Sequence, residues 1–270
     1  MSNETTDGRV LARRNDERVL KALHKYGWLR ARDLAALIWM RTGKRARDAL
    51  RLETVQVDPP SRRMAQRTLA RLRMSKKVLN MRAPDGSQIY GLAEAGVRSL
   101  ADMGIAAKSG KDQIRRVSLS HYHHRRLTNE VAVLGAMLGY RVSTEAEIAA
   151  GRWFGGLDGI HGKRPDVALR DGKGVWLVEV ERSRRNARDY QKLLNWLLSL
   201  WPVGRRAEPL PSGYELRQVV IVGSDAFMRK LKNDMVRLGW TEQQAHQRLL
   251  HLSLLYMDEA KLIRTVKRNA

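Results

Sequence analysis

Apolar residues in the N-terminal part of the chain recur with helical spacing. From Asn15 they repeat at positions 19, 20, 22 and 23 until Tyr26-Gly27-Trp28 ends the run. The same spacing predicts a second helix over 32–40 and a third over 62–74, where Ala65, Leu69 and Leu72 share one side. Ser61 is the expected N-cap of this third helix.

Two strand-like runs follow these helices. They cover residues 77–82 and 88–92 and flank a turn at Pro84-Asp85-Gly86, after which a helix is expected over 93–103. Three helices followed by a β-hairpin is the order of a winged helix-turn-helix. The alternative is a helical module for protein interaction, with a solvated arginine face.

Arginines favour the DNA-binding interpretation. On the third helix they would enter the major groove, and one more lies on the hairpin that would form the wing. These predicted DNA contacts are Arg62, Arg63, Arg67, Arg71, Arg73 and Arg82.

The remaining chain predicts a mixed α/β domain, separated from the first by a linker over 104–118. The expected order is a helix over 120–138, a strand over 140–143, a glycine-rich loop over 151–162, a hairpin, a helix over 186–200, a strand over 216–223, a helix over 225–238, a strand near 252–257 and a basic tail.

The excess of basic residues indicates what kind of partner the protein binds. Lys and Arg number 51 against 28 Asp and Glu, a formal net charge of +23, and this excess predicts a polyanionic partner, most simply double-stranded DNA. An anionic membrane surface competes less well, because no basic amphipathic helix stands out. The chain has no cysteine, which excludes disulfides and thiolate metal sites. We expect a soluble, cytoplasmic protein without membrane insertion.

Three carboxylates on the predicted hairpin carry the candidate chemistry. Glu179 and Glu181 alternate on one strand and therefore share a face. If Gly172-Lys173 is a two-residue turn, residues whose numbers sum to 345 lie opposite each other, and Asp166 faces Glu179. Like charges in opposed positions are destabilising unless a cation lies between them, and such oxygen ligands suit Mg²⁺ or Mn²⁺. The other interpretation is a solvated hairpin whose acids are neutralised by Arg164 and Arg182.

The order of elements and the sequence around these acids resemble the restriction-endonuclease-like fold, also called PD-(D/E)xK. Pro165-Asp166 followed by Glu179-Val180-Glu181 is similar to its motif, with Glu181 where that fold usually has lysine. The resemblance implies that Asp166, Glu179 and Glu181 are catalytic metal ligands, with Glu181 as a ligand or as the base. Lys192 would stabilise the transition-state phosphate in place of the motif lysine, or is a solvated lysine. Lys163 and Arg164 would hold the phosphate.

A closer resemblance is to the replication-relaxation family, which includes the C-class mobilisation relaxases of conjugative plasmids. It rests on residues 124–130 (HRRLTNE), on Arg164-Pro165-Asp166, on residues 177–182 (LVEVER) and on residues 190–193 (YQKL). The resemblance implies a DNA-processing protein of a mobile element. His124 fits its pattern. The other interpretation is a helix-end histidine that hydrogen-bonds or contacts phosphate. Glu130 is an additional acid or the partner of Arg126 in a helix-surface ion pair.

Two other candidate nucleophiles and a histidine pair carry less weight. His121-Tyr122-His123 resembles the histidine cluster of another relaxase class, but on a helix the two histidines point to different sides, so we interpret it as a false match. Tyr122 and Tyr190 are nucleophiles in principle. We expect Tyr190 to be a packing residue behind the hairpin.

These observations predict an α+β protein made of an N-terminal winged helix-turn-helix and an α/β restriction-endonuclease-like domain. The predicted organisation is a flexible N-terminus over 1–14, the winged helix over 15–103, the linker over 104–118 and the nuclease-like domain over 119–270. The leading hypothesis is a metal-dependent relaxase or nickase that cuts one strand at an origin of transfer or replication. The alternatives are a non-catalytic origin-binding or regulatory protein and a double-strand nuclease. Accessory mobilisation proteins are expected partners, and a homodimer is compatible with the sequence.

Overall fold

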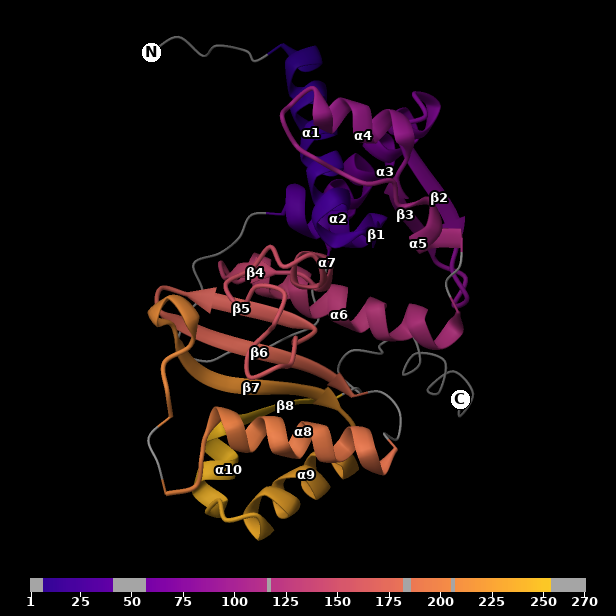
Figure 1. Ribbon diagram of the computed structural model, residues 1–270. Coiled ribbons are helices and arrows are strands. Elements are labelled where there is room, and N and C mark those ends of the chain that lie inside the picture. Colours follow the sequence, from indigo (N-terminus) through magenta and orange to yellow (C-terminus); the bar gives the residue numbers. More distant parts are fainter. Residues whose placement is uncertain (1–6, 41–56, 116–117, 182–185, 205–206, 254–270) are drawn as a thin grey trace, which may run out of the picture. The chain divides into compact units, whose positions relative to one another are not determined.

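The computed structural model describes residues 7–40, 57–115, 118–181, 186–204 and 207–253 of the chain (Figure 1). They form two compact units, which divide between Asn129 and Glu130. This division falls inside one helix, α6 (Leu119–Met137), and not in the segment 104–118 that we predicted as a linker. No described helix is both long and apolar enough to cross a membrane.

The first unit is a helical layer on a small antiparallel sheet (Figure 1). The strands pair in the order β1-β3-β2, so that β3 is central. Its elements are α1 (Gly8–Tyr26), β1 (Trp28–Arg30), α2 (Ala31–Ile38), α3 (Pro59–Met74), β2 (Val78–Arg82), β3 (Gln88–Leu92), α4 (Glu94–Ala101) and α5 (Lys111–Arg115), followed by the start of α6.

The predicted helices and hairpin of this unit are present, with several corrections. Residues 8–14, expected to be flexible, belong to α1, because the Asp7 carboxylate accepts the Arg9 N–H and caps the helix at 2.9 Å. The N-cap of α3 is Asp58 and not Ser61, whose own N–H donates to Asp58 at 2.7 Å. Strand β1 and helix α5 were not predicted.

The second unit is built around a five-stranded sheet with the order β4-β5-β6-β7-β8. The pairs β4–β5 and β5–β6 are antiparallel. The pairs β6–β7 and β7–β8 are parallel. Its elements are the end of α6, β4 (Arg141–Ser143), α7 (Glu145–Ala149), β5 (Val167–Asp171), β6 (Gly174–Glu181), α8 (Ala187–Leu200), β7 (Glu215–Gly223), α9 (Asp225–Arg237), α10 (Glu242–Arg248) and β8 (Leu249–Ser253). Helices α7 and α10 were not predicted.

Both faces of this sheet are covered. One face packs Leu177 and Ile221 against buried residues of α8 and α9 such as Leu197 and Leu231 (Figure 1). The other face meets the end of α6, where Gly135 lies so close to Leu169 that a Cβ at position 135 would be 2.6 Å from its Cδ2. Buried apolar surface on both sides explains the continuous apolar run from Val219 to Val222 in β7.

The β5–β6 hairpin has the register predicted from its sequence. Val167 pairs with Val178 and Asp171 with Gly174, and both pairs sum to 345. Gly172 adopts a φ of 56°, as a tight hairpin turn requires. The ladder extends one step further, because the Asp166 N–H donates to the Val178 carbonyl at 2.9 Å. The register therefore brings Asp166 to the position opposite Glu179.

Candidate functional site

The predicted acidic residues meet at the carboxyl end of β6. Glu179 and Glu181 are both buried there, although both carry a carboxyl group. Asp166 is half-buried beside them, and its Oδ2 accepts the backbone N–H of Val180 at 2.8 Å. Buried carboxylates need a compensating charge or hydrogen bond, so the surroundings of each decide what this site can do.

Lys163 supplies the compensating charge at Glu179. Its ammonium forms an ion pair with Glu179 Oε1 and lies 4.6 Å from the centre of the Trp196 ring. Trp196 is fixed in turn, since its indole N–H donates to the Ile160 carbonyl at 2.9 Å. Sequence reasoning had placed Lys163 against a phosphate. The signal that could have revealed the pairing is the need to neutralise a carboxylate on a fully buried strand.

The loop before β5 positions this lysine. Ile160 and Lys163 exchange backbone hydrogen bonds of 2.8 and 3.1 Å, which fold the chain back on itself. Gly159 has a φ of 76°, and a Cβ there would lie 2.3 Å from the Lys163 carbonyl oxygen. Only glycine fits such an approach, so the glycine-rich loop has a defined structural role at the site.

Glu181 lies at the end of the same strand, next to the backbone of β7. It pairs with Gly223, where a Cβ would be 3.2 Å from the Glu181 carbonyl oxygen. The carboxyl ends of parallel strands are the usual ligand-binding edge of α/β sheets. The acids therefore occupy the edge of the sheet at which chemistry is expected.

The described residues contain no group of three His, Asp or Glu side chains arranged to hold a metal ion. Glu179 is bound to an ammonium, and the Asp166 carboxylate accepts a backbone N–H. The three predicted ligands thus share one end of the sheet, and an ammonium is bound to one of them.

The remaining predicted residues of the nuclease-like domain are dispersed. Lys192 is exposed on α8 and pairs with Asp189, one turn earlier, at 2.9 Å. Arg164 is exposed in the loop before β5. Glu130 and His124 are both half-buried on α6, on opposite sides of the division between the units.

The predicted DNA-contacting arginines lie on the surface of the first unit. Helix α3 buries Ala65, Leu69 and Leu72, as the sequence indicated, and exposes its opposite face. Several arginines of α3 and β2 are exposed and form no ion pair within the described part of the chain: Arg62, Arg63, Arg67, Arg73 and Arg82. Arg71 differs, because its guanidinium donates to Asp16 of α1 at 2.5 Å.

Both tyrosines that sequence reasoning considered as nucleophiles are held in hydrogen bonds. Tyr122 is fully buried, stacks on Trp28 at 5.4 Å and donates to Asp85 Oδ2 at 2.6 Å. Tyr190 donates to Asp234 Oδ2 at 2.8 Å. Burial, followed by the carboxylate partner, raises the pKa of both phenols, which disfavours the phenolate form. Tyr190 packs against the core, as expected.

Comparison with known proteins gives a family match. The family model described as Replication-relaxation matches residues 20–195 of this chain, a range that includes most of the first unit and the acidic hairpin. Neither the curated proteins nor the solved structures include a match.

Proposed function

Because this match spans more than half of its length, the chain belongs to the replication-relaxation family, and we propose that it binds double-stranded DNA at an origin of a mobile element. The family indicates a role in replication or mobilisation of such an element. Its first unit would be a winged helix, with α3 in the major groove and the β2–β3 hairpin as the wing.

The exposed arginine face of α3 is the observation that carries this proposal. Arg63 and Arg67 lie one turn apart, opposite the buried stripe, and neither is used in an ion pair within the described residues. The order of helices and strands, with β3 between β1 and β2, is the one that presents such a helix beside a hairpin. A guanidinium in that position can bond a phosphate or the edge of guanine.

Strand cleavage in the second unit is a further candidate function. It is favoured by the convergence of Asp166, Glu179 and Glu181 on a sheet with the strand order of the restriction-endonuclease-like core. Cleavage of this kind would need Mg²⁺ or Mn²⁺. The Lys163–Glu179 ion pair favours the opposite candidate, a non-catalytic origin-binding protein in which an ammonium takes the place of the cation.

Binding can be tested with duplexes from the DNA that flanks the gene. The double variant Arg63→Ala/Arg67→Ala should lose most of its affinity, and the slope of log K against log salt should decrease by about 2. Arg217→Ala is the control, because Arg217 is an exposed arginine of the second unit. Equal losses in both proteins would show that only overall charge matters and would refute the assigned interface.

Cleavage can be tested on a supercoiled plasmid that carries the same DNA, with Mn²⁺ or Mg²⁺. Open circles from the native protein and Asp158→Ala, but not from Asp166→Ala, would establish a nickase. Asp158 is a suitable control because it is an exposed acid in the loop before β5. Linear product would indicate a double-strand nuclease. Intact supercoils together with site-selective binding would support the non-catalytic function.

A further inference from the structure

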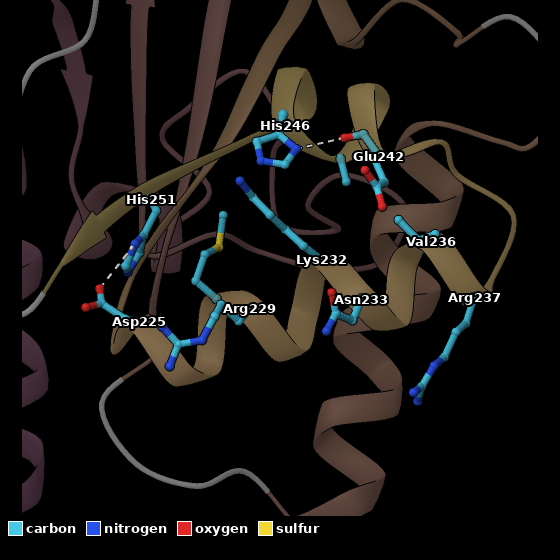
Figure 2. A pocket seen from close by; sticks show the side chains of 11 residues that line it. Asp225, Arg229, Lys232, Asn233, Val236, Arg237, Glu242, His246 and His251 are labelled. Atoms are coloured by element: carbon cyan, nitrogen blue, oxygen red, sulfur yellow. Dashed lines mark hydrogen bonds and ion pairs between the residues drawn. The ribbon is translucent and has the colours of Figure 1, made fainter.

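A groove in the second unit lies outside the acidic site. It lies between α9, α10 and β8 (Figure 2). Its volume is about 640 Å³. Its floor is apolar, where Met228 and Ala245 are buried. Basic side chains rise around this floor from three elements, and they determine what the groove can bind.

Lys232 of α9 is the central cation. It is half-buried, forms no ion pair within the described chain, and extends from α9 toward the side of the groove where His246 lies (Figure 2). Burial lowers the pKa of its ammonium. Arg229 lies one turn earlier on the same helix, is exposed, and also has no acidic partner among the described residues. Figure 2 shows the two charged ends pointing apart, so that Lys232 is the cation inside the groove and Arg229 lies at its rim.

Among the described residues, none of the other charged groups that line the groove forms an ion pair with Lys232 or Arg229. Asp225 faces His251, with 3.7 Å between the carboxylate and Nδ1. Arg237 is bound to Asp234 at 3.5 Å. The remaining acid in the lining is Glu242, in the first turn of α10.

His246 adds a hydrogen-bonding group on the opposite side of the groove. Its Nδ1 is 2.9 Å from the Glu242 carbonyl oxygen. A carbonyl can only accept, so Nδ1 carries the hydrogen and Nε2 is left for a ligand.

The groove shares a face of the sheet with the acidic site. Glu179 pairs with Ile221 and Ile221 with His251 across three parallel strands, so the three side chains form one row. Two strand spacings separate its ends, a distance of about 10 Å between Cα atoms. A short stretch of one DNA strand can span that distance along the carboxyl ends of β6, β7 and β8.

We propose that this groove binds a backbone phosphate of a DNA strand that passes the carboxyl end of β6, with Lys232 as the cationic ligand. The inference rests on the proposed DNA-binding function and adds a second contact region in the other unit. Lysine contacts phosphate as a compact charge. A free nucleotide offers the same phosphate group and is the competing source.

The test measures binding of a labelled single-stranded oligonucleotide by anisotropy over a series of salt concentrations. Lys232→Met keeps the aliphatic stem and removes the charge. It should weaken binding roughly tenfold, since a charge-assisted bond is lost, and reduce the salt slope by about 0.7. Lys173→Met is the matched control, because Lys173 is exposed on the β5–β6 turn at the other end of β6.

Protection from acetylation provides a measurement that does not depend on a variant. The oligonucleotide should slow acetylation of Lys232 in the native protein and leave Lys173 unchanged. Equal effects at both lysines, in binding or in protection, would overturn the assigned site. Protection by a nucleoside monophosphate or inorganic phosphate, but not by the oligonucleotide, would overturn the DNA strand as its ligand.

Duplex binding in the same proteins separates the two hypotheses. If the native protein binds its duplex and Lys232→Met binds the oligonucleotide as Lys173→Met does, the phosphate site in the groove is refuted and the origin-binding function is not. Failure of the native protein to select its own flanking DNA would refute the origin-binding function itself.

Discussion

Replacing Lys163 by methionine should destabilise the second unit through the charge that it leaves behind. Methionine keeps the length and the apolar contact with Trp196 but removes the ammonium. Glu179, whose side chain is only 2% exposed, would then carry a buried negative charge without this partner. The stability of the sheet edge therefore depends on a lysine in the loop before β5.

The size of this effect follows from the burial of the two partners. Removing one member of a fully buried ion pair costs about 3 to 5 kcal/mol. The Lys163 side chain is 22% exposed, so water already screens its end of the pair, and we expect about 2 to 3 kcal/mol. Glu179→Gln should cost less, about 1 to 2 kcal/mol, because the remaining ammonium can reach solvent.

Urea unfolding of the native protein, both single variants and the double variant measures these values and their coupling. The double variant should be more stable than the sum of the single losses indicates, by about 1 to 2 kcal/mol.

Two results would refute the reasoning. A loss of less than about 0.5 kcal/mol in Lys163→Met would place the pair among weak surface ion pairs. Full additivity of the two substitutions would mean that the residues do not interact. Mn²⁺ gives a further comparison: a rise in thermal stability in Lys163→Met that is absent from the native protein would show that the ammonium excludes a cation.

Three other substitutions test separate parts of the structure. Arg71→Ala should weaken duplex binding much less than Arg63→Ala in a titration with labelled DNA, because the Arg71 side chain is already bound to α1. Gly96→Ala should destabilise the protein by about 1 to 3 kcal/mol in urea, although alanine favours helices, because its Cβ would lie 2.2 Å from the Lys77 carbonyl oxygen. Tyr122→Phe should cost about 1 to 2 kcal/mol and leave any nicking intact, and a loss of nicking without loss of stability would contradict its structural role.

The β2–β3 hairpin has a predictable response to acid. Burial alone would raise the pKa of Asp85, but hydrogen bonds from Ser87 and Tyr122 outweigh it, and the pKa is lowered. A carboxyl group with a lowered pKa in the folded state stabilises the protein above its unfolded pKa of about 3.9, and this contribution is lost as the pH falls further. Acid unfolding followed by Trp fluorescence should show this loss below about pH 4, and Asp85→Asn should remove the pH-dependent part.

Local sequence patterns predicted the structure correctly where a single geometric rule, such as turn length or helical spacing, determines it. The register of the β5–β6 hairpin followed from a two-residue turn, and the buried stripe of α3 followed from helical spacing. The short elements β1, α5, α7 and α10 were not predicted, because they contain too few residues to show a helical or strand periodicity. Two of them carried another signal, since Thr144 with Glu147 and Thr241 with Gln244 form capping boxes at the starts of α7 and α10.

Long-range contacts could not be read from local patterns. Lys163 reaches Glu179 only because the glycine-rich loop folds back at Gly159, and neither periodicity nor motif spacing encodes that path. Lys232 gave no signal in the sequence, since its significance depends on burial between α9 and α10. Candidate residues were therefore found by type, and their partners became apparent only in three dimensions.

The division inside α6 decides where the chain can be cut. A fragment that ends at residue 103 or 118 lacks Tyr122, which stacks on Trp28, and Asn129, whose side chain donates to the Trp28 carbonyl at 2.7 Å. Such a fragment would expose an indole that is almost fully buried in the intact chain. A fragment that contains the first unit alone must therefore include α6 through residue 129. Domain-swap experiments should likewise carry the whole helix with one parent.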